Sequence, residues 1–135
     1  MAFHLQRTVL FGECDPAGIM YTPSIADWLV ESTLAFLSQQ LGTPVERYMY
    51  SLKASLPARA LNMEFLKSMT WDEVIDIEIS LTGIRTRSLT VSVTGKNASG
   101  DKTFTGHLTM VSMSPAEGRA VAIPPELRQV LEDQG

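Results

Sequence analysis

The sequence is poor in cysteine and histidine and has no long apolar run in its 135 residues. One cysteine excludes an internal disulfide and is typical of a reducing compartment such as the cytoplasm. No stretch approaches the roughly 20 apolar residues that a transmembrane helix requires, and the first residues lack the apolar core of a signal peptide. We therefore expect a cytoplasmic protein with no membrane partner.

Positive charge is scarce as well. Eleven Lys and Arg residues are set against fifteen Asp and Glu, which gives a net charge of −4. Proteins that bind nucleic acid carry a basic excess, so we expect no nucleic-acid partner, although a local basic patch for a phosphorylated ligand is compatible with this balance. The two histidines, His4 and His107, fall in different predicted strands and are too few for a metal site.

The rest of the composition is that of an ordinary globular protein, with 44% hydrophobic and 19% charged residues. We expect one domain over residues 1–135, since this length can bury a core without disulfides or metals. Alternating apolar residues predict strands over 3–11, 58–66, 75–81, 89–94 and 103–113. A long helix is predicted over 23–41, and a short one over 124–132.

The long helix has clear end signals. Thr22 is the predicted N-cap, Pro23 suits the first helical position, and Gly42 follows the last turn. Two apolar stripes cover most of its circumference, which predicts burial on nearly all sides. One buried helix followed by four strands with hairpin spacing predicts an α+β fold, a curved antiparallel five-stranded sheet wrapped around one long central helix.

Asp15 lies in a Gly- and Pro-rich loop, residues 12–18, directly before this helix. An aspartate before a proline often only stabilises a turn, through bonds to nearby backbone N–H groups. The helix start adds a second interpretation, because its unpaired N–H donors can stabilise negative charge on a carbonyl oxygen. A carboxylate beside such donors suits acyl transfer, either by attacking the carbonyl or by activating water.

Residues 11–21, followed by Pro23, Trp28 and Glu31, resemble the hotdog thioesterases of the 4-hydroxybenzoyl-CoA thioesterase family. The similarity extends over most of the chain and implies the hotdog fold. It implies hydrolysis of an acyl-CoA thioester without metal or redox cofactor, with an aryl group favoured and a short or medium aliphatic chain next. It also implies a homo-oligomer, a dimer or a dimer of dimers (homotetramer), with active sites between subunits.

The resemblance assigns roles residue by residue. Asp15 is the catalytic carboxylate, as nucleophile or general base, and the backbone N–H of Thr22 polarises the thioester carbonyl. Gly18 allows close approach of the backbone to the ligand, Tyr21 lines the acyl pocket, and Trp28 is a further substrate contact. The remaining predicted contacts are to CoA, from the same or a neighbouring subunit, by Arg85, Arg87 and Ser88.

Three other residues bear on whether Asp15 acts alone. A related Tol-Pal-associated branch has histidine where this chain has Thr22, so we expect Asp15 to act without an assisting imidazole. Another branch has its catalytic carboxylate as a glutamate on the long helix, where Glu31 is the only glutamate of this chain, but we favour a structural role for Glu31 because the loop already supplies an acid. Cys14 has no histidine near it in sequence and is expected to pack as a small hydrophobe.

Two alternative functions stay open. A non-catalytic hotdog protein that binds acyl-CoA or an acyl carrier would need the fold but not Asp15. A hotdog hydratase or dehydratase would need an acid/base pair that usually includes histidine, and neither His4 nor His107 lies in the loop or on the long helix.

Overall fold

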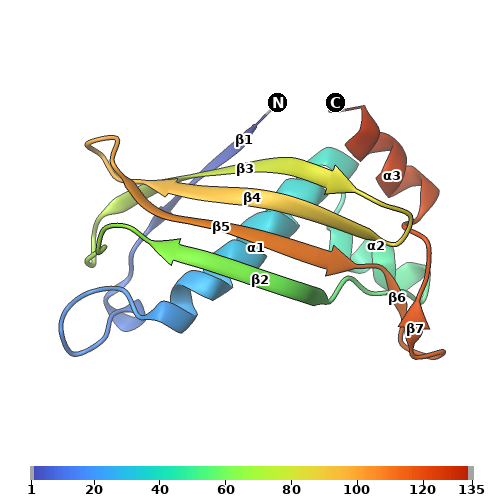
Figure 1. Cartoon of the computed structure of the whole chain (residues 1–135), viewed down its shortest axis with the longest axis horizontal. Coiled ribbons are helices and arrows are strands. Elements are labelled where there is room, and N and C mark those ends of the chain that lie inside the picture. Colours follow the sequence, from blue (N-terminus) through green and yellow to red (C-terminus); the bar gives the residue numbers. More distant parts are fainter. Residues whose placement is uncertain (1, 134–135) are drawn as a thin grey trace.

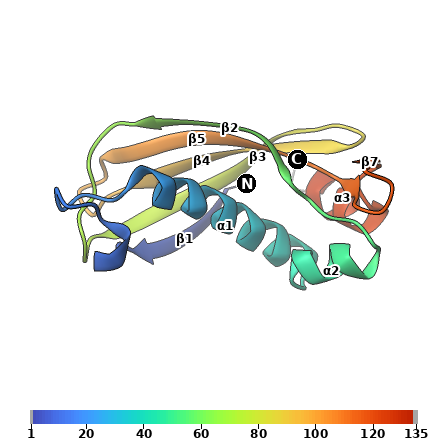
Figure 2. The ribbon, with the colours of Figure 1, turned by 90° about the horizontal axis from the view of Figure 1, so that it is seen from below.

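The computed structural model describes residues 2–133. Five strands form one antiparallel sheet in the order β1-β3-β4-β5-β2 (Figure 1). The strands are β1 (Phe3–Thr8), β2 (Ala58–Phe65), β3 (Val74–Ile84), β4 (Ser88–Lys96) and β5 (Lys102–Val111). One long helix, α1 (Thr22–Leu41), lies along one face of this sheet (Figure 2). The predicted α+β architecture is confirmed.

The core lies between α1 and the inner face of the sheet. Alternate residues of the central strands point inward, and the burial pattern of β4 alternates strictly along its length. Burying one large apolar side chain in this core contributes about 1.5–3 kcal/mol to the stability of the fold. The largest fully buried side chains include Trp28, Leu29, Phe36, Leu37, Ile75, Ile77, Ile79, Leu89, Phe104 and Leu108.

Two predictions about α1 need correction. The helix is not buried on nearly all sides: Asp27, Glu31 and Ala35 form an exposed stripe, because the sheet covers only one side. Its N-cap is Tyr21, without a side-chain cap bond, and Thr22 is the first helical residue. The C-terminal signal was right, since Gly42 ends the helix with φ +82°.

Several short elements escaped sequence reasoning because two to seven residues are too few to show a period. They are η1 (Phe11–Glu13), α2 (Val45–Ser51), β6 (Met113–Ser114) and β7 (Arg119–Ala120). The short C-terminal helix was expected and is α3 (Pro125–Glu132). Within the described residues, no helix is both long and apolar enough to span a bilayer.

The sheet has two distinct ends (Figure 1). We call the end with residues 9–22 and 65–73 the loop end, and the end with the β3–β4 turn, residues 84–88, the hairpin end. The strand register places them apart: Phe65 of β2 pairs with Phe104 of β5, which pairs with Gly95 of β4. Ser88 lies seven residues back along β4, which corresponds to about 23 Å.

Candidate functional site

The Asp15 loop folds back on itself and divides the two carboxylate oxygens of Asp15 between different tasks. Oδ1 accepts hydrogen bonds from the backbone N–H groups of Ala17 (2.8 Å) and Ile19 (3.4 Å). The Asp15 N–H donates to the carbonyl of Ile19 at 2.8 Å. Oδ2 has no hydrogen-bond partner within residues 2–133. The turn-stabilising interpretation therefore holds for one oxygen and leaves the other available for chemistry.

Gly18 fixes the shape of this loop. Its φ of +83° is a conformation that side-chain-bearing residues rarely adopt, and a Cβ there would meet the ring of Trp71 at 3.2 Å. The Thr70 hydroxyl donates to the Gly18 carbonyl at 2.8 Å, and Met20 N–H donates to the Met69 carbonyl at 2.7 Å. The loop is thus held against the segment that follows β2.

Contacts with the side chain of Trp28 on α1 also hold the loop in place. Glu13 accepts from Trp28 Nε1 (2.9 Å) through Oε2 and from the Leu10 N–H (2.9 Å) through Oε1. The Arg7 guanidinium lies 5.1 Å over the Trp28 ring and donates to Glu31 at 2.6 Å. Trp28 is only 1% exposed, so the predicted substrate contact by Trp28 is corrected: its indole positions the loop. Glu31 holds Arg7, as a structural residue would.

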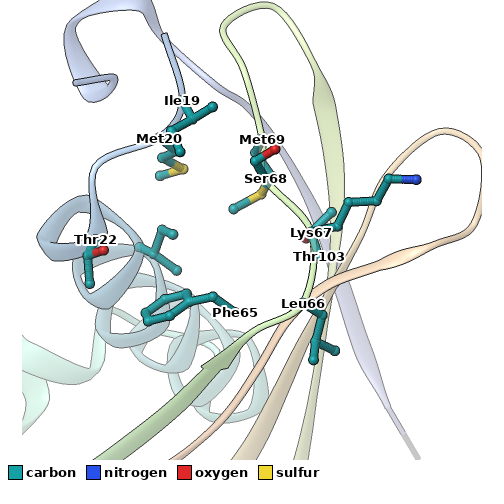
Figure 3. A pocket seen from close by; sticks show the side chains of 10 residues that line it. Ile19, Met20, Thr22, Phe65, Leu66, Lys67, Ser68, Met69 and Thr103 are labelled. Atoms are coloured by element: carbon teal, nitrogen blue, oxygen red, sulfur yellow. The ribbon is translucent and has the colours of Figure 1, made fainter. Parts of the chain in front are cut away.

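A cavity of about 290 Å³ opens beside the start of α1 (Figure 3). Ile19 forms part of its wall and is bonded through its N–H and its carbonyl to Asp15, so the Asp15 loop borders the cavity. The Thr22 N–H at the helix start has no acceptor within residues 2–133, as expected for a first-turn donor. The cavity is lined by Ile19, Met20, Thr22, Ile25, Phe65, Leu66, Lys67, Ser68, Met69 and Thr103.

Two other loop residues lie near this cavity without lining it. Tyr21 is 54% exposed and directly precedes the helix. Cys14 is half-buried and its Sγ donates to the Leu10 carbonyl at 3.7 Å, which fits a packing role. The structure therefore brings together Asp15, Gly18 and Thr22, with Tyr21 at their side.

The predicted CoA contacts lie elsewhere. Arg85 and Arg87 are exposed and Ser88 is half-buried at the hairpin end, roughly 23 Å along the strand direction from the cavity of their own chain. The backbone of this turn is held by the C-terminal segment, since Ile123 N–H donates to the Thr86 carbonyl at 2.9 Å. Neither arginine side chain forms an ion pair with the acids of the described chain.

The cavity also contains residues that sequence reasoning missed, from the segment after β2 and from β5. Lys67 Nζ donates to Asp101 at 2.8 Å. This hydrogen bond and the accompanying charge attraction raise the pKa of Lys67 and lower the pKa of Asp101. Residues 2–133 contain no group of three His, Cys, Asp or Glu side chains placed to bind a metal ion.

A five-stranded antiparallel sheet packed on one long helix is the hotdog fold of thioesterases, and solved structures of this fold align with nearly the whole chain. A 1,4-dihydroxy-2-naphthoyl-CoA thioesterase from Synechocystis gives a TM-score of 0.89 at 16% identity, covering 98% of this chain and 97% of its own. A thioesterase-superfamily protein from Jannaschia sp. CCS1 gives 0.86 at 27% identity, covering 98% and 92%.

Sequence comparison gives the family. Residues 9–131 match the thioesterase-like superfamily, and the chain belongs to it. A 4-hydroxybenzoyl-CoA thioesterase from Pseudomonas sp. (strain CBS-3) is 29% identical over 89 residues. That match covers 62% of this chain and 60% of the relative's length. The predicted fold and the resemblance to this family are confirmed.

Proposed function

We propose that this chain hydrolyses an acyl-CoA thioester to the free acid and CoA. The proposal rests on three features that lie together at the loop end. The unpartnered Oδ2 of Asp15, the available N–H of Thr22 and an apolar cavity lie next to one another. These are the acid, the oxyanion donor and the acyl site that thioester hydrolysis requires.

The chemistry follows from these positions. The thioester oxygen accepts the Thr22 N–H, where the positive end of the α1 dipole stabilises developing negative charge. Asp15 Oδ2 then attacks the carbonyl carbon and expels the CoA thiolate, leaving an anhydride that water hydrolyses. Alternatively, Oδ2 takes a proton from a water molecule that attacks directly. In both routes the two bonds to Oδ1 hold the carboxylate in one orientation.

The cavity favours an aryl group. An apolar cavity of about 150 Å³ accepts benzene, so about 290 Å³ accommodates a substituted ring. Its lining is mostly Met, Ile, Leu and Phe, which suits an aromatic acyl group first and a short or medium aliphatic chain second. The relatives point the same way, since their names specify 4-hydroxybenzoyl and 1,4-dihydroxy-2-naphthoyl esters.

We further infer that the active unit is a homo-oligomer in which two chains pair along β2. This strand is an edge of the sheet, and its inner face leaves Leu61 42% and Phe65 52% exposed. An exposed apolar edge is a template for pairing. Antiparallel pairing about a two-fold axis brings the hairpin end of one chain to the loop end of the other, so that the partner's arginines reach the CoA phosphates. A dimer of dimers in the cytoplasm is the full form of this proposal.

The hydratase alternative finds no support in the positions of the histidines. His4 lies on the outer face of the sheet and contacts Asp76 (3.2 Å) and Glu78 (3.4 Å). His107 lies on the same face beside Asn62. Neither side chain lines the cavity next to Asp15.

Asp15→Asn tests the proposal, because the amide oxygen keeps the acceptor that the loop needs while the negative charge is lost. We expect hydrolysis of aryl- and alkyl-CoA esters, followed by the release of free thiol, to fall by about 10²–10⁴-fold. Binding of the ester, measured by calorimetry, should persist. Asp133→Asn, at the end of α3, is the matched control. Unchanged turnover in Asp15→Asn contradicts the mechanism, and binding without hydrolysis by the unmodified protein identifies a binding protein instead.

A further inference from the structure

The strand β5 contains a bulge next to the cavity. Gly95 pairs with Phe104, but the next pair joins Lys96 to Lys102, so Thr103 has no partner residue on β4. As a result two successive residues, Thr103 and Phe104, are both buried where a regular strand would alternate. A bulge re-aims a side chain in this way, and bulges are frequent beside active sites.

The side chain that this bulge turns inward carries a hydroxyl without a partner. Thr103 is 1% exposed, and its Oγ1 is buried and makes no hydrogen bond within the described chain. The Thr103 carbonyl, in contrast, accepts from the N–H groups of Leu66 (2.9 Å) and Lys67 (3.2 Å). The backbone at this position is satisfied and only the hydroxyl is not. A buried hydroxyl without a partner is unfavourable, and packing alone is served equally well by valine.

Thr103 lines the cavity, on the side opposite Thr22 (Figure 3). The other polar groups of the wall are satisfied or exposed: Lys67 is bound to Asp101, while Thr22 and Ser68 are exposed to water. Among the residues that line the cavity, Thr103 is thus the one whose side chain carries a buried polar atom without a partner in the described chain. A hydroxyl can donate or accept, so it pairs with a hydroxyl or carbonyl oxygen.

We propose that Thr103 is a specificity-determining residue of the acyl cavity, which selects an acyl group with a hydroxyl or oxo substituent over the unsubstituted one. This inference rests on the proposed hydrolysis and adds to it the residue that distinguishes a substituted from an unsubstituted acyl group. The apolar wall holds the carbon skeleton, and the Thr103 hydroxyl binds the substituent at the side of the cavity away from the helix start.

The test compares hydroxylated and plain esters in matched variants. We expect the unmodified protein to hydrolyse at least one of the 2-, 3- and 4-hydroxybenzoyl-CoA esters with kcat/KM roughly tenfold above that for benzoyl-CoA, which is the value of one hydrogen bond. Thr103→Val keeps the shape and removes the hydroxyl, so the ratio of kcat/KM between the hydroxylated and the plain ester should fall by roughly tenfold, to about one. Thr105→Val, on the outer face of the same strand, should leave the preference intact.

A second pair keeps the test valid if the valine variant does not fold. Thr103→Ser and Thr103→Ala both remove the methyl group, and only the serine keeps the hydroxyl, so the preference must follow the serine. Equal preference in the serine and alanine variants, or in Thr103→Val and the unmodified protein, overturns the role of Thr103 and leaves the proposed hydrolysis standing. The absence of hydrolysis of every ester by the unmodified protein overturns the proposed function itself.

Discussion

The loop end and the hairpin end of the sheet carry complementary halves of what a CoA-ester hydrolase requires. The loop end has an unpartnered carboxylate oxygen, an available N–H and an apolar cavity, but its cation Lys67 is neutralised by Asp101 at 2.8 Å. The hairpin end has Arg85 and Arg87, which are exposed and form no ion pair with the described acids. The proposed function thus places acyl chemistry and phosphate binding at opposite ends of the sheet.

The two ends are also built differently. The hairpin turn is closed by the bond from Arg85 N–H to the Ser88 carbonyl at 2.8 Å. Its distant contacts go to the backbone, since Ile123 N–H donates to the Thr86 carbonyl, and its arginine side chains stay exposed. The loop depends on distant residues, since Gly18 lies against Trp71 and Met20 binds Met69. Replacing an exposed arginine side chain leaves these backbone bonds in place, whereas a shift of the loop moves the atoms that take part in the proposed reaction. This contrast predicts where single changes abolish activity and where they only weaken binding.

The largest effect is expected from a matched pair of glycine variants. Gly18→Ala forces a side chain into a left-handed backbone conformation and against Trp71, so the loop and its carboxylate shift. We expect kcat/KM to fall by about 100-fold and stability to fall by about 1–2 kcal/mol, measured by thiol release and urea unfolding. Gly83→Ala, near the hairpin end, meets nothing within 4 Å and should change neither quantity. Equal losses in both variants would contradict the contrast between the ends.

The next effect concerns the hairpin cations. The double variant Arg85→Ala/Arg87→Ala should raise KM for the CoA ester about tenfold and leave kcat within about threefold, because phosphate contacts far from the carbonyl are made equally in ground and transition states. Steady-state kinetics at low ionic strength measure this best. Arg119→Ala is the control, since that guanidinium is already bound to Glu117 at 2.8 Å. A normal KM in the double variant removes these residues from the site.

Mixing variant chains decides which chain supplies the arginines. A dimer with one Asp15→Asn chain and one Arg85→Ala/Arg87→Ala chain contains one complete site only if each site combines the carboxylate of one chain with the arginines of its partner. Co-refolding the two variants should then restore part of the activity at low ester concentration. The absence of any recovery in a mixture shown to exchange chains would place both groups in the same chain.

The sequence predicted the skeleton of the molecule well, because periodicity is strong in its long elements. The alternation of Ile75, Ile77 and Ile79 marks the inner face of β3, and Gly42 marks the end of α1. The Asp15 loop was also recognised, since its Gly and Pro residues cannot continue a strand. These patterns reflect the local environment of each segment, and the local environments together predict the fold class.

The missed parts depend on contacts between distant segments. Thr103 reads as an ordinary strand residue, and only its pairing with β4 reveals the bulge that turns it inward. Trp28 reads as a substrate contact in the family motif, yet Glu13 and Arg7 enclose it. The two apolar stripes of α1 predict burial on nearly all sides, but the sheet covers only one side, and Asp27, Glu31 and Ala35 stay exposed. A local sequence pattern does not determine the register of a strand or which surface of a helix another element covers.

A smaller effect should follow from freeing the loop-end cation. Asp101→Asn removes the negative charge that compensates Lys67 beside the cavity. We expect KM for the CoA ester to fall by about two- to threefold, with kcat unchanged, because an exposed charge gives a weak and screened attraction for phosphate. The effect should vanish at about 1 M salt and in the double variant with Lys67→Met. A rise in KM would show that Asp101 itself orders the cavity wall.

The smallest expected effect is the pH dependence of folding stability that the Lys67–Asp101 pair causes. The hydrogen bond from Lys67 and its charge hold the pKa of Asp101 below its ordinary value of 3.8. A lowered carboxyl pKa stabilises the folded chain above the unfolded value, and this contribution is lost as pH falls through the folded value. The pKa of Lys67 is raised above 10.5, so its contribution to stability is present below 10.5 and is lost only at more alkaline pH.

The unmodified protein should therefore exceed Asp101→Asn in Tm by a small amount at pH 6, and the difference should close toward pH 2. A difference that persisted at pH 2 would assign the effect to the turn between β4 and β5. The Arg85→Ala/Arg87→Ala variant should show no such acid-dependent difference, because neither arginine is paired with an acid in the described chain.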